Sequence, residues 1–315
     1  MNPAFWHRKR VLVTGGSGFV GRWLCRALAP AEVELHILDL LRPHNFDLAY
    51  TYHQTDLRDL PAVEALLQQV KPDVIMHLAG QPGVESSHNN PLGAYESNVL
   101  STFNLLEACR RHGKVQALLA VSSNHVYGDQ PVEPTPEDAP LNGTAMYAVS
   151  KVCSDVLARA YGKTYGLPVA IARMTNSFGG DDHHVTHIVT GSILSVLKGE
   201  RPIIKNSGRD VKSYLYIKDT VDGLLTVTES AVLRPESRGE AYNLMADAPV
   251  SVAELVEAIF AAAGSNLKAD IRRPDAHFER ESLDSTKTRS ELGWKPRYTL
   301  SAGLAEAIAW YRQHA

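Results

Sequence analysis

The sequence predicts an α/β protein in which a doubly wound parallel sheet is followed by a smaller mixed α/β domain. Short apolar runs alternate with amphipathic segments from residue 10 to about 175, an order typical of parallel strands joined by helices. A glycine-rich turn follows the first apolar run, and the second half mixes short strands with helices. The 315 residues, 44% of them hydrophobic, suffice for one large domain or two.

The first half holds four apolar runs, each as long as a strand that helices cover on both faces. These predicted strands lie in KRVLVTGG (9–16), VELHILDL (33–40), PDVIMHLAG (72–80) and VQALLAVSS (115–123). The predicted helices lie in GRWLCRALA (21–29), LPAVEALLQQV (60–70) and PLGAYESNVLSTFNLLEACRRHG (91–113). Gly113 gives the last of them a glycine C-cap.

The second half predicts helices in HIVTGSILSVLKGE (187–200) and SVAELVEAIFAAAG (251–264), and short strands in RPIIKN (201–206) and EAYNLM (240–245). We expect a first domain over residues 1–175 that also receives part of 210–245. The second domain is expected over 176–315. The chain would then cross between the domains more than once.

Charge and composition exclude several classes of partner. The formal net charge of -3 gives no electrostatic reason to expect nucleic acid. No apolar run approaches the ~20 residues that span a bilayer, and the apolar run near the N-terminus is too short for a signal peptide. The three cysteines show no metal-ligand spacing, so we expect reduced thiols in a cytoplasmic protein without a membrane partner.

The turn in VLVTGGSGFVGRWL (11–24) carries glycines where a phosphate must approach the backbone. Gly15, Gly18 and Gly21 are three residues apart, and Gly16, Gly18 and Gly21 also satisfy G-x-G-x-x-G. Amides at the start of the following helix, together with the positive end of its dipole, can hold a pyrophosphate. Strand, glycine turn and helix in this order predict a dinucleotide site.

Asp39 ends the second predicted strand, where a carboxylate can accept hydrogen bonds from the adenosine ribose hydroxyls. The same carboxylate would repel a 2′-phosphate, so the predicted cofactor is NAD. Arg42 lies close enough in sequence to keep NADP open.

Tyr147 and Lys151 fall four residues apart in AMYAVSKVCSD (145–155) and so share one face of a helix. An ammonium close to a phenol favours the phenolate and lowers the tyrosine pKa from about 10. Such a tyrosine can take a proton from an alcohol near neutral pH. The pair alone is also compatible with an ordinary helix surface, so its meaning depends on the surrounding motifs.

These motifs resemble those of the extended short-chain dehydrogenase/reductases, in the branch of nucleotide-sugar epimerases and dehydratases. The resemblance runs in family order along nearly the whole chain and implies a Rossmann-like sheet with a C-terminal substrate domain. It is carried by TGGSGFVG (14–21), TDLRD (55–59), HLAG (77–80), YESNVLSTFNLLEAC (95–109), SSNHVYGD (122–129), YAVSK (147–151), RMTNSFGG (173–180) and LDSTKTRSELGWKPRYTLSAGLAEAIAWY (283–311).

The resemblance implies three catalytic residues, Ser123, Tyr147 and Lys151. Tyr147 is the base, Ser123 hydrogen-bonds the reacting sugar oxygen, and Lys151 holds the nicotinamide ribose. Together with the positive nicotinamide ring, Lys151 also keeps the phenol acidic. The implied NAD contacts are Gly15, Gly18, Phe19, Val20, Gly21, Asp39, Asp56, Leu57, Leu78, Ala79, Asn98, Tyr147 and Lys151.

The two residues that follow Ser123 distinguish the two reactions of this branch, epimerisation and dehydration. A 4,6-dehydratase of the family commonly carries an acidic pair there, whereas this sequence has Asn124 and His125. An amide is not a proton acid or base at accessible pH, but an imidazole titrates near neutrality. The sequence therefore favours a 4-epimerase that recycles NADH through a transient keto-sugar. A dehydratase that uses His125 or another base is the alternative.

The substrate implied by the resemblance is a nucleotide-diphosphate sugar, bound in a cleft between the domains. Asn176 matches a substrate-binding asparagine, and Lys212 occupies the position of an arginine that contacts the diphosphate. Lysine neutralises phosphate but lacks the two-pronged contact of a guanidinium. Arg273 and Arg280 are the candidates for a second basic contact, each weighed against a solvated surface charge.

The segment GGDDHHVTHIV (179–189) contains Asp182, His183, His184 and His187. In a helix, His183 and His187 would share a face, as metal ligands often do. No distant ligand set completes a recognisable site. We therefore expect no metal, and favour a loop that contacts the sugar over ordinary surface polarity.

Two further classes remain as alternatives. A non-catalytic NAD-binding protein would not need Ser123, Tyr147 and Lys151 in family order, and a keto-sugar reductase would consume NADPH stoichiometrically. By resemblance, helices in NVLSTFNLLEACRR (98–111) and YAVSKVCSDVLARAYGKTYG (147–166) are expected to form a homodimer bundle. Alternatively, the rest of the chain covers their apolar faces.

Overall fold

The structure is a computed structural model that describes residues 2–44, 46–275 and 280–314. A seven-stranded sheet lies at its centre, with every neighbouring pair parallel. Its strands, in spatial order, are β11 (Ala241–Leu244), β6 (Val169–Met174), β5 (Ala117–Ser123), β4 (Val74–His77), β1 (Arg10–Thr14), β2 (Glu34–Leu38) and β3 (Thr51–His53). The predicted fold class is confirmed.

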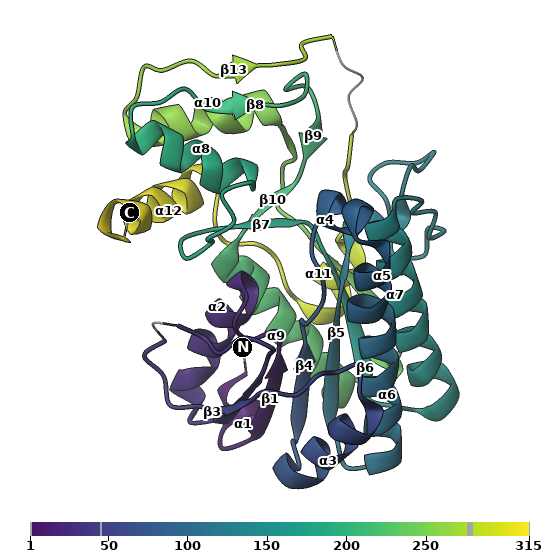
Figure 1. The fold of residues 1–315 in the computed structure, drawn as a ribbon. Coiled ribbons are helices and arrows are strands. Elements are labelled where there is room, and N and C mark those ends of the chain that lie inside the picture. The colour runs from purple at the N-terminus through teal and green to yellow at the C-terminus, as the bar shows by residue number, and fades with distance from the viewer. Residues whose placement is uncertain (1, 45, 276–279, 315) are drawn as a thin grey trace.

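Helices cover both faces of the sheet (Figure 1). One face carries α3 (Leu60–Val70), α6 (Ser101–His112) and α7 (Met146–Tyr165), and the other carries α2 (Phe19–Leu28) and α9 (Ile217–Leu233). Along β1 the buried side chains alternate, because Val11 and Val13 belong to one apolar cluster and Leu12 belongs to the other. The sheet is therefore packed on both faces, which explains the continuous apolar runs of its strands.

The predicted helix over 91–113 is not one regular helix. It comprises α5 (Pro91–Ala94), a π-helical turn (Tyr95–Leu100) and α6. Such π-helical insertions are rare and frequently mark functional sites. Gly113 ends α6 with a φ of 68°, as the sequence predicts.

Among the residues that the structure describes, the second lobe contains three helices and three short strand pairs. Its helices are α8 (Ile188–Leu197), α10 (Val252–Ala263) and α12 (Leu300–His314). Its strand pairs are β7 (Asn176–Phe178) with β10 (Tyr214–Tyr216), β9 (Val211–Lys212) with β12 (Val250–Ser251), and β8 (Ile203–Ile204) with β13 (Asp270–Ile271). Strand β11 and helix α9 come from the second half of the chain but belong to the central layers.

The topology fixes where a ligand can bind. Strand β1 lies between β2 and β4, so the connections leave it in opposite directions across the sheet. Ligands of open α/β sheets bind outside the carboxyl ends of the strands at such a switch point. Within the described part of the chain, no helix is long and apolar enough to cross a bilayer.

Candidate active site

The glycine turn between β1 and α2 is packed so closely that side chains are excluded. Gly15 has a φ of +71°, and a Cβ there would lie 2.7 Å from the backbone nitrogen of Ala79. A Cβ on Gly21 would lie 2.3 Å from the carbonyl oxygen of Gly15. Gly18 caps α2 without a side-chain hydrogen bond, and Phe19 and Val20 begin the helix. The turn thus presents bare backbone at a helix start, which fits a dinucleotide pyrophosphate.

Asp39 lies beside this turn. Its carboxylate accepts hydrogen bonds from the backbone nitrogens of Ser17 at 3.0 Å and Leu41 at 3.3 Å. Arg42 stacks over the ring of Tyr52 at 5.8 Å from its centroid. The carboxylate is therefore held at the glycine turn by backbone amides, in a position suited to a ribose.

The other predicted cofactor residues line the same edge of the sheet. The backbone nitrogen of Ala79 donates to the hydroxyl of Thr14, and that of Leu78 donates to the Thr14 carbonyl. Leu57 is buried, and its carbonyl accepts a hydrogen bond from Asn104. The Arg58 guanidinium hydrogen-bonds Asp56 and holds the pKa of this carboxyl below its usual value.

Asn98 ties two parts of the site together from inside the π-helical turn. Its Oδ1 accepts from the backbone nitrogen of Gln81 at 2.8 Å, and its Nδ2 donates to Ser150 Oγ at 2.8 Å. Asn98 is 1% exposed, so these contacts are shielded from water. The loop after β4 is thereby fixed to α7, the helix that carries Tyr147 and Lys151.

Ser123 and Tyr147 meet at the carboxyl end of β5. A side-chain hydrogen bond joins them, and the ring of His125 lies edge-on to that of Tyr147, with 5.6 Å between centroids. Burial raises the pKa of Tyr147, and the hydrogen bond from Ser123 opposes that shift only in part. The protein chain alone therefore does not lower the pKa of the Tyr147 phenol.

The Lys151 ammonium is directed to the strand. It donates to the carbonyl of Val121 at 3.0 Å. Burial lowers the pKa of Lys151 to about 8, against the opposing effect of Asp155. Helical spacing places the lysine on the correct face, but its side chain reaches the strand rather than the phenol. The joint effect of Lys151 and the nicotinamide ring on the phenol stays a prediction.

A carboxylate that sequence reasoning missed lies against this centre. Asn124 Nδ2 donates to Glu281 Oε2 at 2.7 Å, and Lys212 Nζ lies 3.2 Å from Glu281 Oε1. Asn176 lies nearby, because its Nδ2 donates to the carbonyl of Ser213, next to Lys212. The structure thus brings three of the predicted substrate residues to one region, with Glu281 between two of them. No local pattern marks Glu281, which is 157 residues from Asn124.

The remaining basic candidates lie at the surface. Arg280 forms an ion pair with Glu133 at 3.1 Å, and its side chain is 60% exposed. Arg273 is exposed as well. The backbone of Arg280 pairs with Val211, next to Lys212, in an isolated β-bridge. The contribution of either arginine to substrate binding stays a prediction.

The segment 181–187 forms a turn, not the helix that would place His183 and His187 on one face. Asp182 is 1% exposed and accepts hydrogen bonds from His184 Nδ1 at 3.1 Å and His187 Nδ1 at 2.7 Å. Among the residues that the structure describes, these three form the one group whose potential ligand atoms lie within 4.8 Å of one another. Hydrogen bonding to a buried carboxylate accounts for the arrangement.

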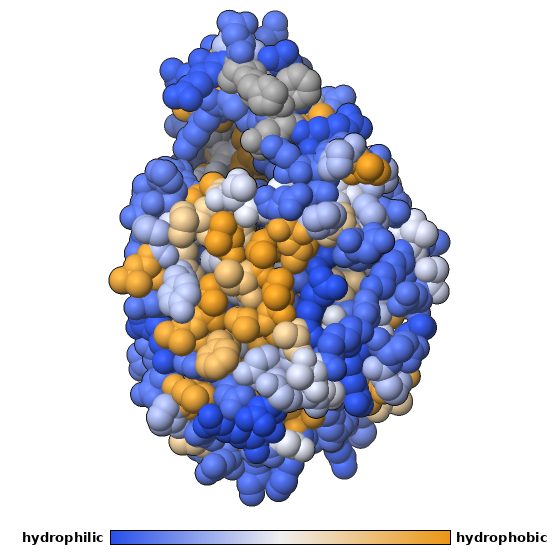
Figure 2. All heavy atoms as spheres, turned by 90° about the vertical axis from the view of Figure 1, so that its right-hand side faces the viewer, coloured by the Kyte–Doolittle hydropathy of each residue, from blue (hydrophilic) through white to orange (hydrophobic). Residues whose placement is uncertain are grey.

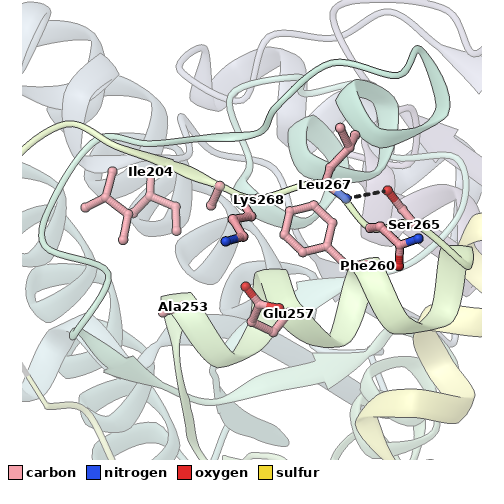
Figure 3. Close-up of a pocket in the computed structure, with 10 residues that line it drawn as sticks. Ile204, Ala253, Glu257, Phe260, Ser265, Leu267 and Lys268 are labelled. Carbon is pink, nitrogen blue, oxygen red and sulfur yellow. Dashed lines mark hydrogen bonds between the residues drawn. The ribbon is translucent and has the colours of Figure 1, made fainter.

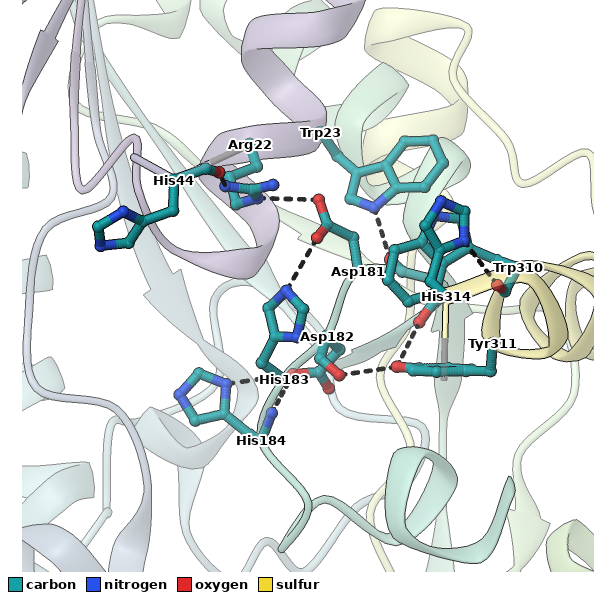
Figure 4. A network of polar contacts seen from close by, with 12 residues as sticks. Arg22, Trp23, His44, Asp181, Asp182, His183, His184, Trp310, Tyr311 and His314 are labelled. Carbon is teal, nitrogen blue, oxygen red and sulfur yellow. Dashed lines mark hydrogen bonds and ion pairs between the residues drawn. The ribbon is translucent and has the colours of Figure 1, made fainter. Parts of the chain in front are cut away.

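The same turn joins the two lobes (Figure 4). Asp181 accepts from Arg22 Nε at 2.8 Å and from Arg26 Nη1 at 2.6 Å, both on α2. On the other side, the hydroxyl of Tyr311 on α12 donates to the carbonyl of Asp182 at 2.7 Å. The turn therefore holds α2, the helix that follows the glycine turn, against the second lobe.

A cavity of 420 Å³ lies elsewhere in the second lobe, between α10 and the chain that leads to β13 (Figure 3). Phe260, Leu267 and Ile204 line it together with Glu257 and Lys268. None of the predicted catalytic, cofactor or substrate residues lines this cavity. This cavity is therefore separate from the predicted active site.

Known proteins with similar sequences belong to one family. A family model described as the NAD dependent epimerase/dehydratase family matches residues 11–244. A dTDP-glucose 4,6-dehydratase of Streptomyces griseus is 31% identical over 319 residues, which cover 96% of this chain and 94% of that protein. A UDP-glucose 4-epimerase of Mycolicibacterium smegmatis is also 31% identical, over 96% of this chain and 98% of that one.

Solved structures divide between the same two activities. The UDP-glucose 4-epimerase of Thermus thermophilus, in complex with NAD, superposes with a TM-score of 0.85 at 27% identity, covering 97% of this chain and 100% of that chain. A double mutant of dTDP-glucose 4,6-dehydratase from Streptomyces venezuelae, also with NAD bound, gives a TM-score of 0.83 at 30% identity, covering 96% and 97%. Overall similarity therefore does not separate epimerase from dehydratase.

Proposed function

The chain belongs to the NAD-dependent epimerase/dehydratase family, and on this premise we propose that it is a nucleotide-sugar 4-epimerase. It is an enzyme, and its cofactor is NAD. The observation that carries the choice of reaction is the pair of residues after Ser123. Asn124 and His125 stand where a dehydratase of the family commonly has two acids. An epimerase needs no acid there, because it only removes and returns a hydride and a hydroxyl proton.

In the proposed mechanism, the glycine turn and Asp39 hold NAD, whose chemistry is to accept a hydride from the sugar carbon and return it. Tyr147 takes the proton from the sugar hydroxyl and later gives it back. Ser123 hydrogen-bonds the same oxygen and so keeps it beside the phenol. Lys151 binds the nicotinamide ribose from its place against β5, and Asn98 keeps the surrounding backbone fixed.

On the substrate side, we propose that Lys212 and Asn176 bind the diphosphate, with Arg273 and Arg280 as outer basic contacts. The second lobe, residues 176–315 without the elements that join the central sheet, then holds the nucleotide sugar. Asn124 and His125 face the sugar near the reacting carbon.

Proton NMR of the protein with NAD and separate UDP-, dTDP-, GDP- and CDP-hexoses tests the reaction. We expect a product that differs from its substrate only in ring coupling constants, which also identifies the inverted carbon. A new C6 methyl doublet beside a keto carbon would show dehydration instead. The edge-on contact between His125 and Tyr147 favours His125 as the base of that alternative. In a separate assay with added NADPH and a nucleotide keto-sugar, stoichiometric oxidation of NADPH would indicate a keto-sugar reductase.

We further propose that the protein is a cytoplasmic homodimer. Figure 2 shows a broad hydrophobic area on the face of the molecule formed by α5, α6 and α7. Large apolar side chains exposed on these helices and on the π-helical turn between α5 and α6 are Leu92, Tyr95, Phe103, Met146, Val149, Val156 and Tyr165. Exposed apolar patches of this kind commonly mark interfaces. The cytoplasmic assignment is supported by three free cysteines.

A further inference from the structure

Glu281 brings a carboxylate to the catalytic centre from the far end of the chain. Its backbone nitrogen donates to the carbonyl of Val211 at 2.9 Å, which anchors it beside β9. Its side chain is 22% exposed and contacts Asn124 through one oxygen and Lys212 through the other. Isolated ion pairs at a protein surface contribute little to stability. The Glu281 carboxylate, however, also accepts a hydrogen bond from the side chain of Asn124, which is only 7% exposed and follows Ser123 directly.

The carboxylate decides which way the amide of Asn124 faces. An ionised carboxylate only accepts hydrogen bonds, so the NH₂ group of Asn124 must point to Glu281. The carbonyl oxygen of Asn124 then points to Ser123, whose hydroxyl donates to it at 3.3 Å. The oxygen of Ser123 also accepts from the backbone nitrogen of His125 at 3.3 Å, which leaves one lone pair of the hydroxyl available. While the phenol of Tyr147 is protonated, it can donate to that lone pair.

The other oxygen of Glu281 neutralises the lysine that we propose for the diphosphate. Lys212 and Glu281 are both largely shielded, with side chains 24% and 22% exposed. A diphosphate that binds Lys212 must therefore compete with a carboxylate that already holds the ammonium. The same carboxylate thus opposes substrate binding on one side and orders the catalytic serine on the other.

We propose that Glu281 is a positioning residue that couples the diphosphate site to the catalytic serine. Through Asn124 it fixes the direction of the Ser123 hydroxyl, and through Lys212 it makes diphosphate binding weaker than the lysine alone would allow. This proposal rests on the proposed function. Part of the binding energy between the diphosphate and Lys212 is then used to displace Glu281. The carboxylate lowers the affinity for the substrate, but it improves the geometry of the reacting groups.

The test compares Glu281→Ala and Glu281→Gln with the unchanged protein, all loaded with NAD. Calorimetry with UDP and with dTDP measures diphosphate binding, and the NMR assay gives kcat. For Glu281→Ala we expect roughly three- to five-fold tighter binding of the nucleotide, because a partly exposed ion pair no longer competes. We expect kcat to fall roughly ten-fold or more, because Ser123 loses its fixed orientation. Glu281→Gln can still accept from Asn124 and should retain more of kcat.

Opposite changes in affinity and turnover separate positioning from a merely structural role, which would weaken both. Glu236→Gln is the matched control, because Glu236 forms an exposed ion pair with Arg234 away from the site and should change neither value. Weaker or unchanged nucleotide binding in Glu281→Ala, or an unchanged kcat, would overturn the proposal. If the unchanged protein bound neither nucleotide, the proposed diphosphate site and this coupling would both be wrong. If it bound nucleotide but converted no hexose, only the proposed reaction would fail, and the affinity change would still test the link to Lys212.

Discussion

At the scale of single residues, the environment of Tyr147 sets the strictest condition on the mechanism. Burial raises the pKa of its phenol, whereas proton abstraction needs the phenolate. The Lys151 ammonium points to the backbone of β5, so it supplies less charge to the phenol than helical spacing suggests. Under the proposed function, the positive nicotinamide ring of bound NAD would then lower the pKa of this phenol.

Replacing Tyr147 by Phe removes the proposed base and keeps the ring. We expect turnover to fall by roughly 10²- to 10⁴-fold, the usual contribution of general acid–base catalysis. NAD affinity should stay nearly unchanged, because the glycine turn and Asp39 are untouched. Rate measurements by NMR and NAD titration by fluorescence check both points. Turnover equal to that of the unchanged protein would refute the assigned role of Tyr147.

Asp155, one turn beyond Lys151 on α7, forms a buried ion pair with Arg173 of β6. Two hydrogen bonds of 2.9 and 2.8 Å join the side chains, and both are 0% exposed. Asp155→Asn leaves the guanidinium without its counter-charge, so we expect a loss of about 3–5 kcal/mol in the free energy of unfolding. Denaturant unfolding measures this loss. The double variant with Arg173→Met should recover part of it, and a single variant as stable as the unchanged protein would contradict the prediction.

At the scale of elements, the sequence predicts the regular helix α7 but does not predict the π-helical turn. Tyr147, Lys151 and Asp155 recur every four residues, so the regular geometry of a helix places them on one face of α7. Asn98 reaches both Gln81 and Ser150 from the π-helical turn. A pattern of apolar residues at helical spacing does not reveal an extra residue in one turn, so the sequence predicted a single regular helix there.

The turn over residues 181–187 gives a prediction about pH. The carboxylate of Asp182 raises the pKa of His187 by hydrogen bonding and by its charge. His187 therefore contributes stability that is fully present below its unfolded pKa of about 6.5 and is lost as pH rises through the folded pKa. We expect His187→Gln to be destabilised most at about pH 5–6 and least at about pH 8.

Thermal unfolding of both proteins across this range measures the difference. Asp182 has a lowered pKa in the folded protein, so its own contribution is lost only as pH falls further into the acid range. His183→Gln is the control, because His183 contacts Asp181 and its side chain is 73% exposed. A stability difference for His187→Gln that grew with rising pH would contradict the assigned ion pair.

At the scale of the whole molecule, the apolar face over α5, α6 and α7 predicts the state of assembly. A stable dimer buries roughly 1,200–2,000 Å² in total, with apolar and aromatic side chains near the centre of the interface. Phe103 and Val156, on the facing helices α6 and α7, are 39% and 49% exposed. We expect the double substitution Phe103→Lys with Val156→Lys to convert a dimer into a monomer, because it places unpaired charges in the contact.

Light scattering after size exclusion gives the mass directly. Leu233→Lys is the control, because Leu233 is an exposed apolar residue at the end of α9, on the opposite side of the sheet. The control should keep the mass of the unchanged protein. An unchanged protein that elutes as a monomer at micromolar concentration would show that this face does not pair two copies.

The sequence by itself determined the fold class, four of the sheet strands in the first half of the chain, the glycine turn, and the order of Ser123, Tyr147 and Lys151, because each is a local pattern of a few residues. Periodicity of two or 3.6 residues and the demands of tight turns act over short distances along the chain. Strands β3 and β6 were not predicted, and the roles of the individual cofactor residues stay predictions.

The tertiary structure alone decided which side chains meet at the site. Glu281 reaches Asn124 across 157 residues, and Arg22 reaches Asp181 across 159. Tertiary packing also turns the Lys151 ammonium toward the strand instead of the phenol. Such contacts depend on the path of the whole chain and on the burial of charges, neither of which is encoded in the spacing of neighbouring residues.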